Sequence, residues 1–550
     1  MEQQRNLLFV LFLILSLFVY WAWESDQLEQ ARMAEQAAMH QELIERGIID
    51  AHSISGKTVR LVSDSLELAI SLSGGDIVDA RLPQIRQEIN KDDPFHLLQE
   101  RHDFVYVAQS GLAGRDGPDS RGRPQYASSA EEFHLGEDDD QVSAVLTYSG
   151  DGLNLRKIYT LSRGSYVVGL RYEIENKSSE AKSMAFYGQL KQTIDSSHAE
   201  LGAFGMVAGA YRGTAYSTDE LRYEKNSLDD LGEYAQNRMN LSLTTTSGWI
   251  AMIQHYFVTA WIVDGSGHEQ GWHVIYSNAS SNGRDAILGA RTTVHSIEPG
   301  QSQIYEYKLW VGPKNQDQMA LLASNLDLTV DYGWLWFISI PLFRMLAFIH
   351  GFVGNWGFAI IILTLVVRGV LFPLTKAQYT SMAKMRLLAP KMQELKDRYK
   401  DDRQKLSQET MRLYKNEKVN PLGGCLPLLI QMPIFIALYW TLMESTELRH
   451  APFILWINDL SVYDPWFVTP ILYGITMYII QKMSPTPVTD PLQRKIFMAM
   501  PLVFTFMFCT FPAGLTIYWL VSNIFTIFQQ VIIFKSLEKR GLHVREAKKD

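Results

Sequence analysis

The chain shows two patterns of hydrophobic and polar positions, and the change between them divides it into two parts. From about Lys57, hydrophobic and polar residues alternate with a period of two, as in Leu66–Leu72 and Tyr305–Val311. Such strands bury one face and expose the other, so their recurrence predicts an antiparallel β-sandwich over residues 57–330. The stretch 110–140, rich in Gly, Asp, Ser and Pro, predicts a long mobile loop within this domain.

Long apolar runs form the second pattern. They occupy residues 1–23, 352–374, 421–442, 466–480, 496–511 and 515–534. A helix needs about 20 apolar residues to cross a bilayer, so these runs predict six transmembrane helices. The runs 466–480 and 496–511 fall short of that length, which predicts a locally thinned bilayer beside them.

The first apolar run predicts an uncleaved signal anchor. Residues 1–23 end in Tyr20-Trp21-Ala22-Trp23, without the small residues that a signal-peptide cleavage site needs. Residues 24–56 are charged and mostly helix-forming, and we expect them to tether the sandwich to this anchor.

The segment 334–350 is apolar and aromatic, but it contains Pro341 and Arg344. If it crossed the membrane, all later helices would be reversed, and the stretch 375–420 would lie outside. That stretch has 12 Lys or Arg against six Asp or Glu, and such basic loops normally stay in the cytoplasm. We therefore expect 334–350 to be an interfacial amphipathic helix on the outer leaflet. The stretch 375–420 then forms a cytoplasmic helical hairpin, broken near Lys400.

Charge separates the two parts as clearly as hydrophobicity does. Residues 24–340 carry 26 Lys or Arg and 44 Asp or Glu, a net charge of −18, whereas the whole chain has −8. An acidic outer domain is thus joined to a basic membrane part, whose loops place both termini in the cytoplasm. The hairpin and the basic tail 535–550 would suit anionic headgroups or a machine that delivers nascent chains.

Arg368 is the most unusual residue of the membrane part. It lies about six residues inside the far end of the run 352–374, roughly 9 Å deep at 1.5 Å per residue. A guanidinium at such depth costs at least ~2.5–3.5 kcal/mol unless water or a partner relieves it. The apolar stretches of the other predicted membrane helices, the first of which begins at Leu7, contain no Asp or Glu. The side chain therefore either extends to the nearer interface or faces a hydrated cavity within the protein.

Several neutral polar side chains also lie in these runs. Thr364 precedes Arg368 by four residues and shares its helix face. The others are Gln431, Thr516, Ser522, Asn523, Gln529 and Gln530. Each alone is typical of an interhelical hydrogen bond. Together with an arginine that lacks a carboxylate, they predict a hydrated half-channel.

We expect no catalytic residue, cofactor or metal. The outer domain shows no zinc spacing, nucleophile elbow or phosphate-binding loop. Its histidines include His134, His198, His255 and His273. The two cysteines, Cys425 and Cys509, lie in apolar runs, so no disulfide framework is expected. A binding or docking role is predicted for this domain.

Three stretches of the membrane part resemble the YidC family of membrane protein insertases. They are Asn355–Leu374 with its arginine, Asn420–Pro427, and Phe511–Leu515 followed by Tyr518-Trp519. Tyr307–Lys314 also resembles the end of the periplasmic domain of Gram-negative members. The likeness covers essentially the whole chain.

The resemblance implies a bacterial inner-membrane insertase and chaperone that works alone or beside the Sec translocon. It implies five core helices around a groove open to cytoplasm and lipid, and a periplasmic domain similar to sugar-binding supersandwich folds. The family's groove arginine corresponds to Arg368. The aromatic pair of its last helix corresponds to Tyr518 and Trp519. The expected client-contacting residues are these three with Thr364, Gln431, Thr516 and Asn523.

Partners follow from the same resemblance. Nascent membrane proteins are the expected clients, and the Sec translocon with its accessory subunits is an expected neighbour. The hairpin and tail would receive the ribosome or targeting factors, and lipid would surround the helices. No sequence recognition of nucleic acid is expected.

Two other functions stay open from the residues alone. A secondary transporter usually shows internal repeats and membrane carboxylates for ion coupling, and neither is evident here. A membrane-anchored carbohydrate enzyme or binding protein would need only one helix, which would leave Arg368 without a purpose.

Overall fold

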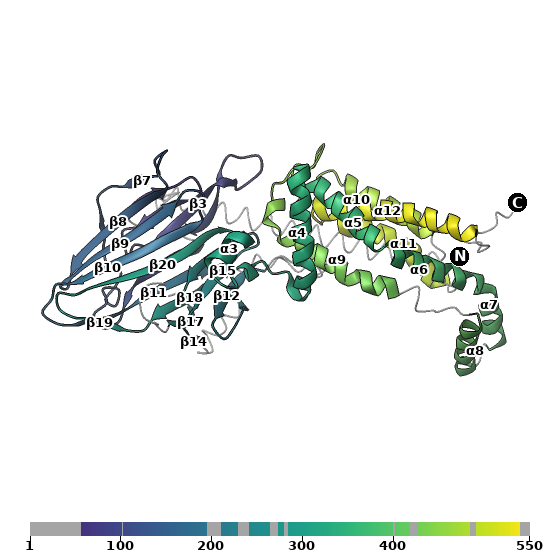
Figure 1. The fold of residues 1–550 in the computed structure, drawn as a ribbon, viewed down its shortest axis with the longest axis horizontal. Coiled ribbons are helices and arrows are strands. Elements are labelled where there is room, and N and C mark those ends of the chain that lie inside the picture. The colour runs from purple at the N-terminus through teal and green to yellow at the C-terminus, as the bar shows by residue number, and fades with distance from the viewer. Residues whose placement is uncertain are drawn as a thin grey trace.

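The computed structural model describes residues 57–101, 103–194, 211–228, 241–263, 273–279, 284–399, 402–417, 426–483 and 491–539. Within these residues, a domain of β-strands is followed by a group of helices, placed end to end in an elongated molecule (Figure 1). The predicted anchor and tether, His198 and most of the basic tail lie outside the described residues.

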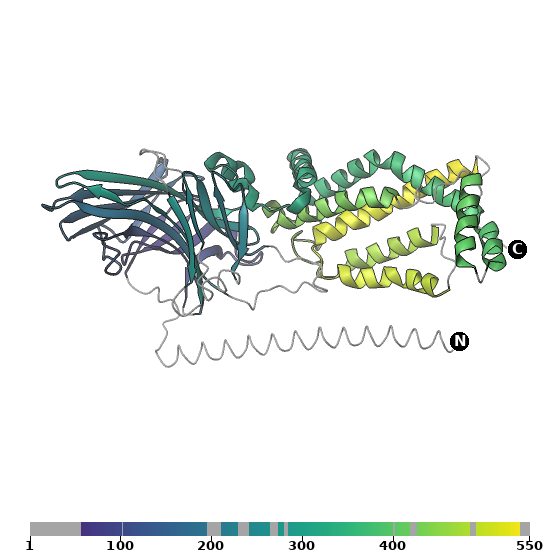
Figure 2. The same cartoon turned by 90° about the horizontal axis from the view of Figure 1, so that it is seen from below.

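The strands form two large sheets that lie face to face (Figure 2). The first sheet contains β1 (Thr58–Val62), β2 (Glu67–Ser71), β3 (Ile77–Arg86), β4 (Pro94–Glu100), β5 (Val105–Ala113), β7 (Glu132–His134), β11 (Lys182–Thr193), β14 (Ser242–Thr245), β17 (His273–Ala279), β18 (Asp285–Thr292) and β19 (His295–Ile297). The second contains β6 (Ala127–Ser128), β8 (Gln141–Gly150), β9 (Leu153–Ser162), β10 (Val167–Asn176), β12 (Gly213–Thr218), β13 (Glu224–Ser227), β15 (Gly248–Ile253), β16 (Phe257–Ile262) and β20 (Ser302–Pro313). Neighbouring strands are antiparallel, except that β1 and β7 are parallel.

The predicted alternation places the core between the sheets. On β10, Val168, Leu170, Tyr172 and Ile174 are buried, whereas Arg171 between them is exposed. β2 and β20 occupy the other stretches in which alternation predicted strands. The strand prediction is therefore confirmed at these places, while the likeness to supersandwich folds stays a prediction.

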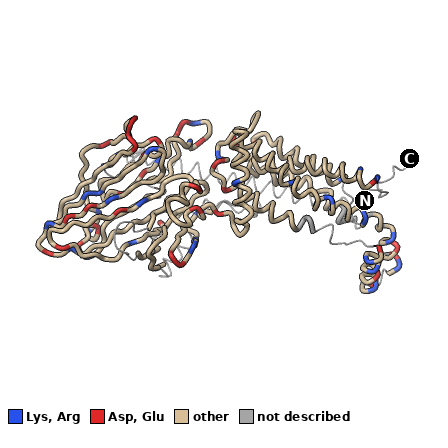
Figure 3. The backbone as a smooth tube through the Cα atoms, in the orientation of Figure 1, with Lys and Arg blue, Asp and Glu red and all other residues tan. Residues whose placement is uncertain are grey.

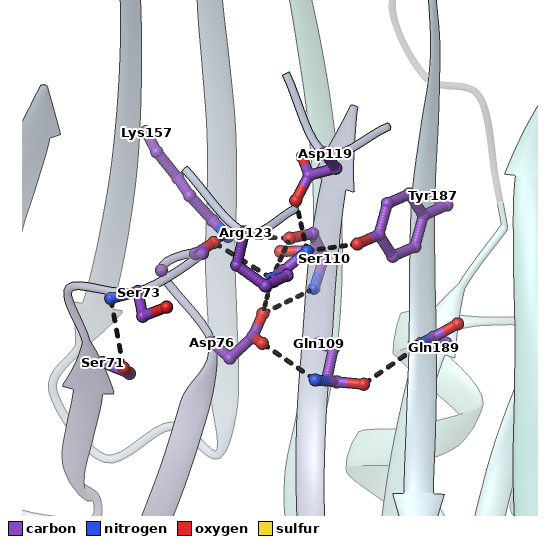
Figure 4. Close-up of polar contacts among 12 residues, drawn as sticks. Ser71, Ser73, Asp76, Gln109, Ser110, Asp119, Arg123, Lys157, Tyr187 and Gln189 are labelled. Atoms are coloured by element: carbon purple, nitrogen blue, oxygen red, sulfur yellow. Dashed lines mark hydrogen bonds and ion pairs between the residues drawn. The ribbon is translucent and has the colours of Figure 1, made fainter. Parts of the chain in front are cut away.

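The stretch 110–140 differs in part from the expected long loop. β5 continues into it, and β6 and β7 lie within it. Arg123 holds the segment between β5 and β6 in place, because its guanidinium contacts the carboxylates of Asp76 and Asp119 and the hydroxyl of Tyr187 (Figure 4). Burial of these groups at the edge of the core is what turns a loop-like sequence into an anchored segment.

Lys157 on β9 is the second cation of this cluster, and it is fully buried. Its Nζ donates to the carbonyl oxygens of Gly74, at 3.0 Å, and Ser110, at 3.1 Å. Both acceptors belong to the opposite sheet or its turns, so the lysine links the two layers (Figure 4). Burial lowers the pKa of Lys157 to about 7.

Helices make up the rest of the described chain. They are α3 (Gln316–Leu322), α4 (Trp336–Val353), α5 (Trp356–Val370), α6 (Phe372–Leu387), α7 (Ala389–Arg398), α8 (Arg403–Asn416), α9 (Leu426–Glu444), α10 (Val468–Met483), α11 (Pro491–Phe508) and α12 (Ala513–Glu538). Short 3-10 helices lie at η2 (Leu326–Thr329), η3 (Gly333–Leu335) and η5 (Thr446–Leu448). Figure 3 shows charged residues over the sandwich and on α7 and α8, but few along the other helices.

Five helices, α5, α9, α10, α11 and α12, run alongside one another, while α4 lies across the end that faces the sandwich (Figures 1 and 2). By length and composition, Gly333–Val353 and Ala513–Glu538 are each long and apolar enough to cross a membrane. Ile430–Glu444 and Phe497–Phe508 are shorter apolar helices. The crosswise course of α4 is the one expected of an interfacial helix, although its length alone would permit a span.

The predicted run 352–374 is not one straight helix. α5 ends at Val370, α6 begins at Phe372, and the two are bent by 59°. Pro373 explains the break, because it lacks an N–H and its ring clashes with the preceding helical turn. α6 then continues into the stretch expected to form the hairpin, so that α7 and α8 make the hairpin proper.

Candidate functional site

Arg368, near the end of α5, meets side chains from two other helices. Its Nε donates to the hydroxyl of Ser522 on α12 at 2.6 Å, and its Nη2 contacts the same oxygen. In the amide orientation that satisfies both groups, the side-chain oxygen of Gln431 on α9 accepts from Nη1 at 2.5 Å and Nη2 at 3.0 Å. The guanidinium thus joins α5, α9 and α12. We call Arg368, Ser522 and Gln431 the Arg368 site.

The backbone of Arg368 is held as well. The amide of Gln529 on α12 donates to its carbonyl oxygen at 3.2 Å. Ser522 and Gln529 are seven residues apart, two helical turns, so they present one polar face of α12 to α5. Gln530, the next residue, instead contacts the hydroxyl of Tyr379 on α6.

Among the described residues, Arg368 forms no ion pair with a carboxylate; the side-chain partners found are Ser522 and Gln431. This arrangement matches the absence of acids from the predicted membrane helices. A half-buried guanidinium with neutral partners keeps an uncompensated positive charge, and such a charge attracts an anion that enters its surroundings.

Two of the predicted site residues donate side-chain hydrogen bonds to the backbone of their own helices. Thr364 is fully buried, and its hydroxyl donates to the carbonyl of Ile360 at 2.7 Å. Thr516 is also fully buried, and its hydroxyl donates to the carbonyl of Pro512 at 3.2 Å. These back-bonds are the ordinary way in which threonine is accommodated within a helix.

The remaining predicted residues lie farther along α12 and pack between helices. Tyr518 is buried in the helical core. Trp519 packs beside Phe435 of α9, with ring centroids 4.4 Å apart, and beside Phe508 of α11 at 5.7 Å. Asn523 donates to the hydroxyl of Thr476 on α10 at 3.1 Å. The predicted residues therefore lie at several helix contacts, and Gln431 is the one among them for which a hydrogen bond to the Arg368 side chain is found.

Ser522 contacts Arg368 but is not among the site residues expected from the sequence. It is one of the polar residues of the apolar runs, and its spacing does not connect it with Arg368. A contact across 154 residues depends on how α12 is rotated against α5, which the sequence pattern does not determine. The sequence signal that could have indicated Ser522 is its position seven residues before Gln529, which places both residues on one face of the helix.

No group of three or more His, Cys, Asp or Glu side chains that could hold a metal ion occurs within the described part of the chain. The other histidines considered from the sequence are dispersed: His255 contacts the carbonyl of Met443, whereas His134 pairs with Glu132.

Comparison with known proteins connects both parts of the chain to one family. Residues 58–345 match the family model described as the YidC periplasmic domain, and residues 348–540 match the model described as 60Kd inner membrane protein. The chain is 51% identical to the membrane protein insertase YidC of Aeromonas hydrophila subsp. hydrophila, covering 99% of this chain and 100% of that protein. It is 50% identical to the membrane protein insertase YidC of Tolumonas auensis, with the same coverage.

A solved structure of an active YidC insertase is also similar, with 18% sequence identity, a TM-score of 0.38, and coverage of 88% of this chain and 93% of that one. The relatives are named as an insertase and not as an enzyme. The two family models meet near residue 346, within α4. The chain therefore belongs to the YidC family of membrane protein insertases.

Proposed function

We propose that this protein inserts membrane proteins into the bacterial inner membrane and assists their folding, with the Arg368 site as the point that receives a polar client segment. Membership of the insertase family supports the activity. The observation that supports the site is the guanidinium, which joins three helices and has only neutral side-chain partners within the described part of the chain.

The proposed mechanism uses a partly hydrated groove beside Arg368. A client's polar tail enters the groove, its acidic groups are attracted by the guanidinium, and its apolar segment moves along the lipid side. Transfer into lipid is then driven by the hydrophobicity of the client itself. Thr364, Thr516, Tyr518, Trp519 and Asn523 are proposed to line the path, with Gln431 beside the cation.

The dielectric of the groove decides how strong this attraction is. Two unit charges 4 Å apart attract by about 4 kcal/mol at an effective dielectric of 20, but by only about 1 kcal/mol in water. A half-buried guanidinium between helices corresponds to the first case more closely than to the second. The effect of Arg368 should therefore be large and should depend on the charge of the client.

The test is insertion of matched clients that differ only in tail charge, into vesicles that contain each variant at equal abundance. Arg368→Lys keeps the charge and should retain much activity. Arg368→Ala should impair the acidic tail by about tenfold or more, since that corresponds to about 1.4 kcal/mol, and spare the neutral tail. Arg368→Glu should be worst for the acidic tail because it repels it.

Equal impairment of acidic and neutral tails by Arg368→Ala would contradict the attraction. Arg368 would then be a structural or hydration element that holds α5, α9 and α12 together. The matched control is Ser522→Ala, which removes a neutral partner but keeps the cation, and which should retain the preference for acidic tails.

The location of each part is proposed with the function. The sandwich would lie in the periplasm, α7 and α8 in the cytoplasm, and both termini in the cytoplasm. The Sec translocon, ribosome and targeting factors are proposed partners, the last two at the basic hairpin and tail. The groove would be open to cytoplasm and lipid and closed on the outer side.

A further inference from the structure

The last residue of α9 forms a buried ion pair with the end of the sandwich. Lys314 follows β20 directly, and its Nζ lies 3.0 Å from Oε2 of Glu444. The exposed fractions of the two side chains are 0% and 2%. Charges removed from water in this way need each other, because neither has solvent to replace a lost partner.

The same helix reaches the Arg368 site. Gln431 and Glu444 both lie on α9, 13 residues apart, which corresponds to about 20 Å along a helix. Between them, the hydroxyl of Ser339 on α4 donates to the carbonyl of Ala437 at 3.1 Å. One helix therefore runs from the end of the sandwich, past α4, to the guanidinium.

A second set of contacts joins the sandwich to the loop after α9. Arg449 donates to the carbonyl oxygens of Arg86, at 2.9 Å, and Gln87, at 3.0 Å. Its guanidinium also lies over the rings of Phe95 and Phe257. These bonds go to exposed backbone at the edge of β3, so water can replace them. The Lys314–Glu444 pair, in contrast, is enclosed on both sides.

We propose that Lys314 is a positioning residue that fixes the outer end of α9, and through it the placement of Gln431 beside Arg368. This inference rests on the proposed function of the Arg368 site. It gives the segment that follows the last strand of the sandwich a role in insertion, and it gives the sheets themselves no such role.

The chemistry of a buried pair makes the proposal testable. Removing one partner leaves a buried charge without compensation, and the helix end must shift to bring it to water. Neutralising both partners leaves no charge, so α9 can stay in place. Single and double variants therefore have opposite consequences, which a simple loss of contact would not produce.

The experiment measures insertion of the acidic-tailed client by the full chain in vesicles, with protease resistance of the sandwich as the measure of folding. The variants are Lys314→Met, Glu444→Gln, the two combined, and Lys314→Arg. We expect each neutralising single change to reduce insertion by about tenfold, and the combination to regain most of it. Lys314→Arg, which keeps the charge, should also retain most activity.

Lys308→Met is the matched control, since Lys308 lies on β20, the strand that precedes Lys314, and is exposed. It should insert clients as the wild type does. A role in positioning also predicts that the losses from Glu444→Gln and Gln431→Ala do not multiply, because both act through α9. Glutamine keeps the shape of glutamate, so Glu444→Gln is the variant best suited to this comparison.

The proposal is overturned if the single variants insert like the wild type, if the neutral pair is as poor as either single change, or if the losses of Glu444→Gln and Gln431→Ala multiply. Arg368→Ala in the same vesicles separates the two hypotheses. If it spares the acidic tail, the proposed function fails. If it impairs that tail while Lys314→Met has no effect, only the positioning role fails.

Discussion

Arg368 and Lys157 are both cations withdrawn from water, and the chain stabilises them differently. Arg368 has a hydroxyl and an amide as partners. Lys157 donates to two carbonyl oxygens and lies over the rings of Tyr126, Tyr159 and Tyr172, with its Nζ 5.1 to 5.9 Å from their centroids. The first arrangement leaves a charge available, whereas burial lowers the pKa of Lys157 to about 7 even though its partners stabilise the charged form.

Lys157 should make the stability of the sandwich depend on pH. Its pKa is about 7 in the folded domain, against 10.5 in an unfolded chain, because burial disfavours the charged form. Between these values the unfolded chain binds more protons, so the free energy of unfolding should rise with pH, by at most about 1.4 kcal/mol per unit. Urea unfolding of the sandwich in the full chain, followed by protease resistance from pH 7 to 9, measures this slope.

The same slope should disappear in Lys157→Met and persist in the control Lys177→Met, which changes an exposed lysine. The tyrosines of the cluster respond above this range, because burial raises the pKa of Tyr126 and of Tyr187 well above that of an exposed tyrosine. A slope that is unchanged in Lys157→Met would show that another group carries it.

In both clusters, the cation was easier to predict from the sequence than its partners were. Arg368 could be found from the sequence because a charge in a long apolar run contradicts its surroundings. Lys157 gave a similar signal, since it occupies an inward position between the buried residues Leu155 and Tyr159. Its partners, like Ser522 for Arg368, could not be found, because they come from strands whose pairing is fixed only by the complete fold.

At the scale of elements, helices and strands with a clear period were predictable, whereas the break between α5 and α6 was not. The alternating stretches became β2, β10 and β20, and α12 covers the last apolar run. The turn between α5 and α6 was missed because hydrophobicity continues through it, although Pro373 marks it. A hydropathy pattern records where lipid is tolerated and does not record where the helix axis changes direction.

The direction of the helices across the membrane is testable with reporters. α7 and α8 lie at the end of the helices opposite the sandwich (Figure 1). A reporter fused after Lys400 should therefore be cytoplasmic, and one fused after Asn458 should be periplasmic. The physical reason is the basic excess of the hairpin against the acidic loop after α9. Alkaline phosphatase and a cytoplasmic fluorescent protein, each fused at both positions, provide opposite readouts.

A periplasmic reporter at residue 400 would reject this topology. It would also mean that α4 crosses the membrane, as its length permits, and does not lie on the outer leaflet. Equal abundance of the fusions, measured by immunoblot, is the necessary control.

At the scale of the whole molecule, the sandwich and the helices meet at a small number of places. The sheets have their own core, which is separate from the helical core. Residues 311–335 then pass between the two, and residues of this segment, such as Met319 and Tyr332, pack against strands of the second sheet. The two sheets thus form one packing unit with its own core. The segment 311–335 packs against this unit and connects it to the helices.

We expect the helices to retain insertion after most of residues 57–310 are removed, provided that α4 stays. The deletion exposes Glu444 to water, where its charge no longer requires a buried partner. It should therefore impair insertion less than Lys314→Met does in the full chain. Insertion into vesicles at equal abundance of both variants measures the difference. Complete loss in a stable, correctly oriented deletion would mean that the sheets take a direct part in insertion.

Arg368 rests on neutral oxygen atoms, and this determines how readily the site could be used again. A resident carboxylate would compete with every arriving client and would reclaim the guanidinium only after each departure. A hydroxyl and an amide give way to a charged group and return when it leaves, because a neutral acceptor attracts the guanidinium less strongly than a carboxylate does. The affinity for any one tail then stays modest, and turnover is limited by the passage of the client into lipid and not by its release from the protein.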